Sequence, residues 1–405
     1  QMMNAPDAGS AQGHTPATWK QWGHGLDPAS IEQMRAACSL PVSVAGALMP
    51  DAHTGYGLPI GGVLATVGAV IPYAVGVDIA CRMRLTVIDQ PASALSGQRD
   101  RLAKAIEEQT RFGIGAEFRD RRNHDVMDLD WSVSPVTKRF RDRAWAQLGT
   151  SGSGNHFVEF GELHVTDPSL GIPTGDYIAL LSHSGSRGPG AQVCQHYSRL
   201  ATDKHTGLSG PQKQLAWLDL DSSEGLEYWA AMELMGHFAA ANHELIHRHI
   251  VKAINAKTLL SVENHHNFAW KETHRIDGIL RDVVVHRKGA TPAGLDTLGI
   301  IPGSMATPGF VVRGRGNPDS LCSASHGAGR LMSRTQARNT FTWSATRKLL
   351  AERGVHLLSA DIDEVPGVYK DIHQVMEAQH DLVEVLASFE PRIVKMAPPG
   401  EKAED

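Results

Sequence analysis

The spacing of hydrophobic and polar positions along this 405-residue chain predicts helices and strands in an irregular order. Apolar residues recur at helical spacing most clearly over 224–256, the longest predicted helix. The earliest predicted helix has Asp27 or Ser30 near its start, and both residue types cap helices. Helices are predicted at residues 28–38, 224–256, 330–352 and 371–386.

Short apolar runs between Gly-rich turns predict the strands, at residues 62–71, 156–160, 177–182, 259–264, 281–287 and 309–314. These runs do not alternate strictly with helices, which favours a mixed α+β fold over a doubly wound sheet. Since no internal repeat or low-complexity linker appears, one large mixed domain is expected over 19–398, with strand-end loops converging on a central cleft. Residues 1–18 are expected to be a flexible lead-in, and 399–405 a flexible tail.

Composition narrows the class of protein. Hydrophobic residues make up 41% of the chain and charged residues 20%, as in globular proteins. No apolar run approaches the roughly twenty residues of a membrane span, and no secretory signal is visible. Four cysteines in so long a chain favour a reduced, cytoplasmic setting over a disulfide framework. The net charge of −5 argues against non-specific coating of nucleic acid, yet permits a local arginine patch.

Residues of metal-ligating type follow nearly every predicted strand, where functional loops usually lie. Any single histidine at such a place is more often a hydrogen-bonding residue than a ligand. Taken together, a carboxylate, a thiol and several imidazoles form a mixed O/S/N set suited to Mn, Fe or Zn, and the carboxylate and thiolate could bridge two ions. The residues are Asp51, His53, Asp78, Cys81, Asn155, His156, Glu159, His183, Arg187, His265, His266, Asn267, His286, Lys288 and His326.

Glycine-rich segments such as "GSGN", "HSGSRGPG" and "SHGAGR" would let backbone N–H groups approach phosphate oxygens, although each could also be a tight turn. A helix expected to begin near Ala328 would add its positive end. Neither the dinucleotide fingerprint nor the GxxxxGK[ST] phosphate loop is present. Arginine side chains can donate two parallel N–H bonds to one phosphate, and five arginines are candidates: Arg187, Arg313, Arg315, Arg330 and Arg334.

From "PVSVAGALMPDAHTGYGLPIGG" to "PRIVKMAP", these motifs resemble the RtcB family of GTP- and manganese-dependent RNA ligases. The resemblance implies that Cys81 bridges two Mn²⁺ ions, although Zn²⁺ or Co²⁺ would also suit the donors. His266 is chosen over His265 because the family's ligand directly precedes an asparagine, here Asn267. The implied metal ligands are Asp78, Cys81, His156, His183 and His266.

The same resemblance implies that His326 is the nucleophile that takes GMP from GTP. Asp51 and His53 would support and orient the metal ligands. Arginines implied to hold RNA phosphates or the triphosphate are Arg187, Arg330 and Arg334. The implied guanylate contacts are Asn155, Glu159, Asn267, Ala328, Tyr369 and Lys395.

The implied activity joins an RNA 3′-phosphate or 2′,3′-cyclic phosphate end to a 5′-hydroxyl end, through a covalent histidine–GMP and an RNA-3′-pp-G intermediate. Its role would be tRNA splicing or RNA repair, with an archease-like activator as an open question. Three alternatives stay open: a nucleotidyltransferase that caps or repairs RNA or DNA 3′-phosphate ends, a two-metal phosphoesterase acting on nucleic-acid ends, and a non-catalytic metal-bound sensor.

Three positions depart from the family pattern. Ala80 and Arg82 stand where the family usually has glycine, and His243 stands where an arginine is expected. A bulky cation beside the bridging thiolate would change the surroundings of the metals. These departures indicate a divergent branch and leave the choice of substrate open.

Overall fold

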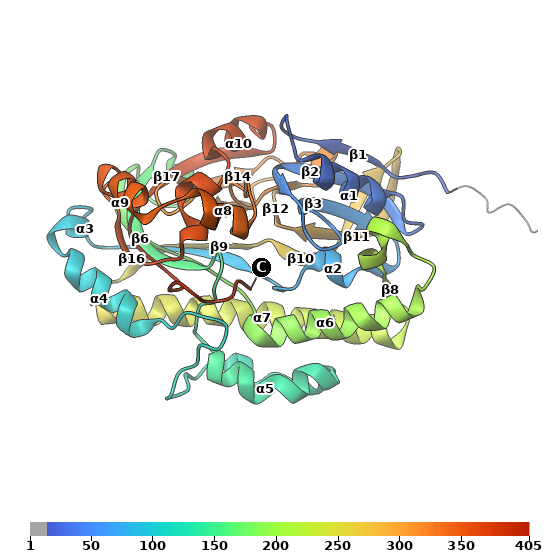
Figure 1. Cartoon of the computed structure of the whole chain (residues 1–405), viewed down its shortest axis with the longest axis horizontal. Coiled ribbons are helices and arrows are strands. Elements are labelled where there is room, and N and C mark those ends of the chain that lie inside the picture. The colour runs from blue at the N-terminus through green and yellow to red at the C-terminus, as the bar shows by residue number, and fades with distance from the viewer. Residues whose placement is uncertain (1–13, 405) are drawn as a thin grey trace, which may run out of the picture.

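The computed structural model describes residues 14–404, in which strands form the centre and helices lie outside them (Figure 1). The helices are α1 (Pro28–Cys38), α2 (Pro72–Val75), α3 (Ala94–Gly97), α4 (Arg99–Gln109), α5 (Pro135–Gln147), α6 (Arg187–Lys204), α7 (Ser223–Ala253), α8 (Arg334–Thr340), α9 (Trp343–Glu352) and α10 (Ile372–Ala378). The strands are β1 (Thr18–Gln21), β2 (Ser43–His53), β3 (Ile60–Thr66), β4 (Ala69–Val70), β5 (Arg82–Ile88), β6 (Phe157–Val165), β7 (Gly175–Ser184), β8 (Leu218–Asp219), β9 (Thr258–His265), β10 (Asn267–Ile276), β11 (Ile279–Lys288), β12 (Ala290–Pro292), β13 (Leu298–Ile301), β14 (Gly309–Gly314), β15 (Ser323–Ser325), β16 (His356–Ser359) and β17 (Val383–Met396).

Two large sheets organise the chain. One has the order β1-β2-β3-β11-β10, and the other runs β13-β14-β17-β6-β7-β5-β9, with β16 added beside β17. Most neighbouring strands are antiparallel, and sheets and helices do not alternate regularly along the chain. The predicted α+β class and all six predicted strand regions are therefore confirmed.

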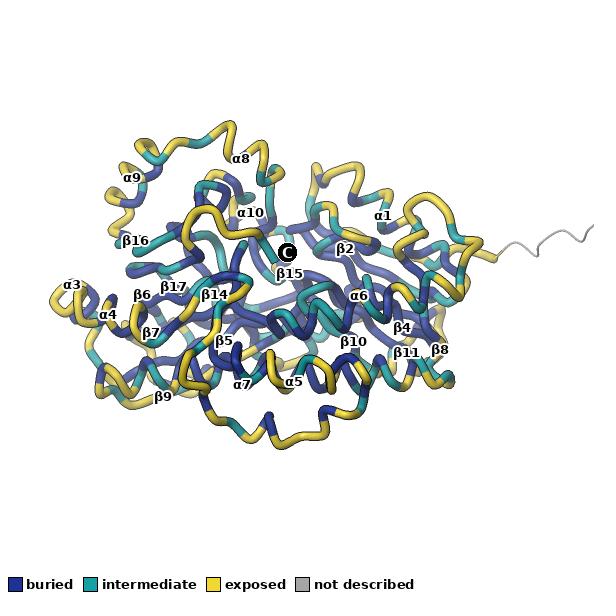
Figure 2. Tube along the Cα trace, turned by 60° about the horizontal axis from the view of Figure 1, so that its bottom comes forward, coloured by how far each residue is buried: buried dark blue, intermediate teal, exposed yellow. Residues whose placement is uncertain are grey.

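Helix α7 packs along the eight-stranded sheet and presents one buried face to it (Figures 1 and 2). Its buried residues include Met232, Met235, Phe238 and Leu245, which belong to the largest apolar cluster of the core. The prediction of a long helix at 224–256 is confirmed within a few residues. The helix predicted at 28–38 is confirmed as well, since the Asp27 carboxylate caps α1 by accepting from the backbone N–H of Ala29 at 3.0 Å.

The helix predicted over 330–352 is wrong at its start and is broken in the middle. Residues 329–331 are extended and pair with 368–370, because Leu331 N donates to Val368 O and Lys370 N donates to Gly329 O. No helix begins near Ala328; instead α8 starts at Arg334, capped by Ser333. Thr342 caps a separate helix, α9.

The helix predicted over 371–386 is too long. It ends at Ala378 as α10, and the chain then turns into strand β17 at Val383. The run "LVEVLASF" after the turn is rich in β-branched and large apolar residues, and the sheet buries part of it. Helical spacing alone did not distinguish this run from a continuing helix.

The ends of the chain add two facts. Residues 1–13, most of the predicted lead-in, lie outside the described residues, and β1 begins at Thr18. Within residues 14–404, no helix combines the length and the apolarity that a bilayer crossing requires. None of the four cysteines, all within the described residues, forms a disulfide.

A buried arginine holds the segment that carries His326. Leu321 and Cys322, which precede β15, both have positive φ angles of 55° and 53°, an unfavourable conformation for side chains of this size. The Arg287 guanidinium donates to the carbonyl oxygens of both, at 2.8 and 3.3 Å, and to Ser323 Oγ at 2.7 Å. Glu272 in turn accepts two hydrogen bonds from Arg287, at 2.6 and 3.0 Å.

The Glu272–Arg287 pair should stabilise the fold in a pH-dependent way. Burial would raise the pKa of Glu272, but hydrogen bonds from His274 and Arg287 outweigh it and lower that pKa to about 2. A carboxyl whose pKa is depressed contributes stability above its unfolded value near 4.5, and loses it as the pH falls towards 2. Glu272→Gln should therefore cost about 3 kcal/mol of unfolding free energy at pH 7.

Urea unfolding of both proteins from pH 7 downwards measures this contribution. The difference between wild type and Glu272→Gln should stay constant above about pH 5 and shrink below it. A difference that does not depend on pH would contradict the assignment.

Candidate active site

The ends of four adjacent strands meet at one edge of the eight-stranded sheet. In the antiparallel register, Arg82 at the start of β5 lies opposite both Ser184 and His265, and Phe157 at the start of β6 lies opposite His183. Loop residues just outside these strand ends are thus brought together from distant parts of the sequence. The sequence-based expectation of a site built from strand-end loops agrees with this arrangement.

The five predicted metal ligands converge at that edge, and their ligating atoms face one another. Cys81 Sγ lies 3.0 Å from His183 Nε2 and 3.5 Å from His156 Nε2. Asp78 Oδ2 lies 2.9 Å from His156 Nε2, and His183 Nε2 lies 3.3 Å from His266 Nε2. His265, the rejected alternative, packs against Phe268 and Trp270 instead.

Two of these imidazoles are held in the neutral form that binds metal ions. Burial and the neighbouring imidazoles lower the pKa of His183 and of His266 well below the ordinary value, so both rings are neutral. For His156, burial acts in the same direction, but the hydrogen bond with Asp78 outweighs it and raises the pKa. Asn155 O lies 3.1 Å from His183 Nδ1 and orients that ring.

The donor set fits a transition-metal ion. Groups of three donors, such as Cys81 Sγ with His156 and His183, lie within 4.8 Å of one another and are buried. His266 Nδ1 is buried without a hydrogen-bond partner among residues 14–404. A thiol, imidazoles and a carboxylate at this spacing match the preferences of Mn, Fe, Co or Zn.

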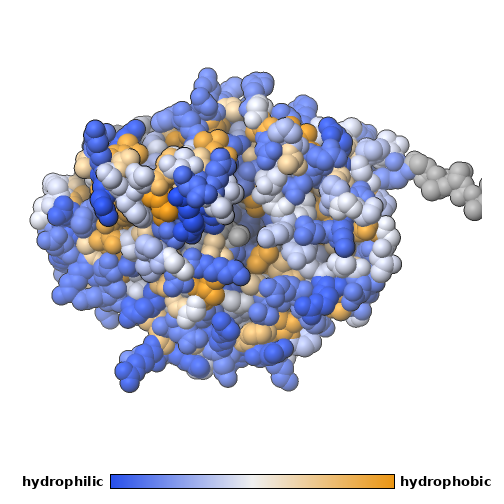
Figure 3. Space-filling model, viewed as in Figure 1, coloured by the Kyte–Doolittle hydropathy of each residue, from blue (hydrophilic) through white to orange (hydrophobic). Residues whose placement is uncertain are grey.

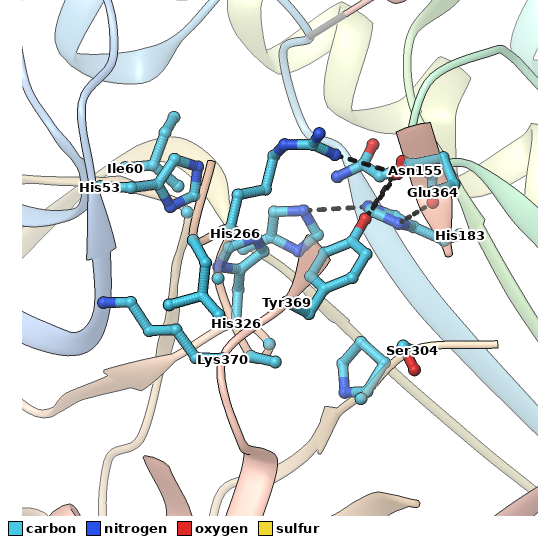
Figure 4. Close-up of a pocket in the computed structure, with 18 of the residues that line it drawn as sticks. His53, Ile60, Asn155, His183, His266, Ser304, His326, Glu364, Tyr369 and Lys370 are labelled. Carbon is cyan, nitrogen blue, oxygen red and sulfur yellow. Dashed lines mark hydrogen bonds and ion pairs between the residues drawn. The ribbon is translucent and has the colours of Figure 1, made fainter. Parts of the chain in front are cut away.

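His326 lies beside this cluster, and its orientation is set by Asp51. The ring centroids of His326 and His266 are 4.7 Å apart, and the two labelled side chains are neighbours in Figure 4. His326 Nδ1 lies 2.7 Å from the fully buried Asp51 Oδ2, so Nδ1–H donates and the lone pair of Nε2 is left free. Asp51 therefore orients His326, whereas the sequence analysis had expected Asp51 to support and orient the metal ligands.

Local backbone features make this pairing possible. Strand β2 leaves its regular register between Leu48 and His53, which lets Asp51 turn towards His326. Lys370 fixes the same segment by donating to the carbonyl oxygens of Pro50 at 3.3 Å and Ala52 at 2.7 Å. His53 Nδ1–H donates to Asp51 O at 3.2 Å, and burial lowers the pKa of His53 to about 4.

A cavity of about 920 Å³ opens beside His326 and the metal-ligand cluster, and the molecular surface is hollowed near the middle of the face in Figure 3. This volume suits a nucleotide-sized ligand. Burial raises the pKa of Glu159 well above its ordinary value. Predicted site residues that line the cavity are His53, Asp78, Cys81, Asn155, Glu159, His183, His266, Asn267, His326, Ala328, Arg330, Arg334 and Tyr369.

Two predicted contact residues are engaged elsewhere. Lys395 lies outside the cavity lining and donates to Glu107 Oε2 at 2.7 Å. Arg187, also outside the lining, is enclosed by Thr150 Oγ1 at 3.1 Å, Gly113 O at 2.6 Å and the carboxylate of Glu404. Their predicted contacts with guanylate and RNA stay predictions.

Asn267 lines the cavity, but its amide is already engaged. It donates to Asp78 O at 3.1 Å and accepts from Gly289 N at 2.9 Å. Asn267 thereby ties the loop that carries Asp78 to the loop beside His326.

Arginines at the cavity wall are balanced by carboxylates. Arg330 Nη1 donates to Glu364 Oε2 at 3.1 Å. The Tyr369 hydroxyl donates to the same oxygen at 2.7 Å, and a dashed line joins the labelled Tyr369 and Glu364 in Figure 4. Arg334 Nη1 lies 3.2 Å from Asp363 Oδ2. A phosphate bound here would compete with these carboxylates for the guanidinium N–H groups of Arg330 and Arg334.

The departures from the family pattern lie behind the site. Because neighbours in a strand point to opposite faces, the side chain of Arg82 turns away from Cys81 and donates to Gly236 O in α7 at 3.1 Å. His243 of α7 pairs with Ser184 O at 3.0 Å. The expected bulk and charge of Arg82 near the metals is therefore not found in the cavity lining. Ala80 adopts a positive φ of 59°, a conformation that glycine tolerates better.

Two lysines that the sequence analysis had not assigned a role in the site, Lys288 and Lys370, also line the cavity. Lys288 was noted as a polar residue at a strand end, and its ammonium donates to Tyr73 O at 3.0 Å; burial lowers its pKa to about 8. Lys370 directly follows Tyr369, which was predicted to contact guanylate, so its position in the sequence could have indicated that Lys370 also lies near the site. His286, noted beside Lys288, is a buried packing residue that accepts from Ile71 N at 2.9 Å.

A buried thiol–imidazole–carboxylate cluster beside an oriented histidine and a nucleotide-sized cavity forms an enzyme site that could hold a metal ion. A sequence model described as "tRNA-splicing ligase RtcB" matches residues 33–396. The "RNA-splicing ligase RtcB" proteins of Mycobacterium bovis and Escherichia coli K12 are 35% and 34% identical to this chain, covering 82% and 84% of it and 91% and 87% of their own length. The "tRNA-splicing ligase RtcB" of Methanococcus maripaludis is 31% identical, covering 91% of this chain and 90% of its own. The chain belongs to the RtcB family of RNA ligases.

Two glycines beside His326 should differ sharply in their tolerance of a side chain. A Cβ at Gly329 would lie 2.1 Å from Asp51 O, and its φ of +80° is unfavourable for alanine. A Cβ at Gly327 would approach no atom more closely than Pro302 O at 3.4 Å. Gly329→Ala should therefore cost at least about 2 kcal/mol of unfolding free energy, and Gly327→Ala less than about 1 kcal/mol. Denaturant unfolding of the two variants measures the contrast, and equal losses would contradict it.

Proposed function

We propose that this ligase joins RNA 3′-phosphate or 2′,3′-cyclic phosphate ends to 5′-hydroxyl ends, using GTP and a covalent histidine–GMP on His326. The observation that carries the proposal is the 2.7 Å contact of Asp51 with His326 Nδ1, beside the ligand cluster and within the cavity. This contact fixes the tautomer in which Nε2 is a nucleophile at neutral pH.

The guanylylation step needs a nucleophile with room around it. Nε2 of His326 attacks the α-phosphorus of GTP; a P–N bond forms, the bond to the β-phosphate oxygen breaks, and pyrophosphate leaves. Gly289 leaves space at the ring, since a Cβ there would lie 3.2 Å from His326 Cε1. Asp51 stabilises the positive charge that the ring acquires.

Transfer and ligation follow from the same geometry. An oxygen of the RNA 3′-phosphate attacks the phosphorus of histidine–GMP, so the P–N bond breaks and the RNA end carries a diphosphate-linked guanylate. The 5′-hydroxyl of the second strand then attacks the RNA phosphate, gives up its proton and releases GMP. Guanylylation thus supplies the leaving group that a bare 3′-phosphate lacks.

We assign two divalent ions, Mn²⁺ by family resemblance, to the cluster of Asp78, Cys81, His156, His183 and His266. When bound, they would neutralise phosphate oxygens and activate the water that opens a cyclic phosphate. Asn155, Glu159, Asn267, Ala328 and Tyr369, all in the cavity lining, are proposed to surround the guanylate. Arg330 and Arg334 are proposed to bind the triphosphate or RNA phosphates.

Four further assignments belong to the proposal. Lys395 as a guanylate contact requires its amine to leave Glu107, and Arg187 as an RNA contact requires it to leave Glu404. DNA 3′-phosphate ends are a second substrate class to test. An archease-like activator is proposed as an optional partner.

Labelling with GTP tests the nucleophile. Wild-type protein incubated with α-³²P-GTP and Mn²⁺ should carry label on a denaturing gel, and His326→Ala should carry none, because the acceptor nitrogen is gone. His373→Ala, which removes an exposed histidine on α10, is the matched control and should label like wild type. Label retained in His326→Ala would refute the assignment, and absence of label in every protein, with RNA ends still hydrolysed, would favour the phosphoesterase alternative.

Metal content tests the ligand cluster. Cys81→Ala removes the sulfur that faces both His156 and His183, so bound Mn²⁺ measured after gel filtration should fall at least about tenfold. Cys194→Ala, which truncates a buried thiol in α6 away from the cluster, should leave metal content unchanged. Equal metal content in the two variants would contradict the proposed site.

A further inference from the structure

The C-terminal segment folds onto the back of the metal-ligand cluster. The family match ends at residue 396, so the segment 399–404 belongs to this chain rather than to the shared pattern. Gly400 N donates to Asp361 Oδ2 at 3.2 Å, and Ser153 Oγ donates to Lys402 O at 2.5 Å. The C-terminal end accordingly lies in the middle of the view in Figure 1. The sequence analysis had expected a flexible tail here.

This path carries the carboxylate of Glu404 to His156 and Arg187. One Glu404 oxygen accepts from Arg187 Nη1, and the other, Oε2, lies 3.5 Å from His156 Nδ1. Only 13% of the Glu404 side chain is exposed. Among residues 14–404, neither His156 Nδ1 nor Glu404 Oε2 makes a hydrogen bond, so a buried donor and a buried acceptor face each other across 3.5 Å.

The two nitrogens of His156 face different groups. Nε2 points to Asp78 and Cys81, so the ligating side of the ring is the side away from Glu404. A metal-bound histidine usually donates its other N–H to a carboxylate or a carbonyl, which fixes the ring and strengthens its donor nitrogen. His183 has such a partner in Asn155 O, and Glu404 stands in the matching place for His156.

Gly152 leaves the space in which these groups meet. A Cβ on Gly152 would lie 2.1 Å from Glu404 Oε2, 2.2 Å from His156 Nδ1 and 2.6 Å from Arg187 Nη1. All three distances are far below contact, so any side chain here would push the three groups apart. Only glycine at this position leaves enough space for Glu404, His156 and Arg187 to lie next to one another.

We propose that Glu404 is a positioning residue that accepts the Nδ1–H of His156 and so strengthens the ion site that His156 shares with Asp78 and Cys81. Arg187 holds the Glu404 carboxylate in place. The inference rests on the proposed metal site and deepens it, because it makes the C-terminal segment a part of the metal centre.

Titration calorimetry with Mn²⁺ on the full chain tests the inference. Glu404→Gln keeps the shape of the side chain and removes its charge, so one of the two ions should bind about 10- to 100-fold more weakly. Glu401→Gln, an exposed carboxylate in the same segment, is the matched control and should bind like wild type. Deletion of residues 399–405 should reproduce the loss.

A spectroscopic readout separates positioning from general structural support. In Co²⁺-loaded protein, the visible d–d bands report on the ligand field at the ions, so Glu404→Gln should shift or weaken them, while its melting temperature stays within a few degrees of wild type. Glu401→Gln should leave the bands unchanged.

The remaining outcomes overturn the inference in different ways. Wild type that binds Mn²⁺, with Glu404→Gln of equal affinity and spectrum, would refute the role of Glu404 and leave the metal site intact. Unchanged metal affinity with tighter binding of an RNA 3′-phosphate would show that Glu404 instead blocks Arg187. Wild type that binds no Mn²⁺ would refute the proposed metal site itself.

Discussion

The hydrogen bond between Asp51 and His326 joins the two halves of the site. Asp51 comes from β2 in the five-stranded sheet and is fully buried, and a buried carboxylate is costly unless it is paired. Its pairing with His326 places that ring 4.7 Å from His266, whose loop belongs to the edge of the eight-stranded sheet. Three features position Asp51 for this contact. They are the irregularity in β2, the close approach of Gly329 to the Asp51 carbonyl, and the hydrogen bond from Lys370 to Ala52 O.

Much of the site could be predicted because residues of metal-ligating type stand at the ends of strands that the sequence pattern also predicts. Cys81 and His156 each stand one residue before a strand and His266 stands one residue after β9, and antiparallel pairing brings the start of one strand to the same edge as the end of its neighbour. The small residues around His326 likewise pointed to close backbone packing. The choice of His266 over His265 agrees with the structure, because consecutive residues at a strand end face opposite ways.

The rest depended on contacts between distant segments. Helical spacing over 330–352 says nothing of the pairing between 329–331 and 368–370, which excludes a helix there. The direction of Arg82 depends on which sheet face α7 covers, and the sequence of β5 alone does not determine that. Glu404 sits in a polar, proline- and glycine-containing segment whose composition is typical of a tail, so its burial could not be foreseen.

Helix α7 determines how rigid the site can be. Helix α7 is hydrogen-bonded to the segments that carry the candidate ligands. Gly236 O accepts from Arg82, the Asn242 amide donates to Gly185 O, and His243 Nε2 donates to Ser184 O. All three α7 residues lie in the interior of this 31-residue helix. Helices open from their ends, and interior turns exchange with solvent only through larger, costlier unfolding events. The scaffold behind the candidate metal ligands is therefore among the last parts of the molecule to open.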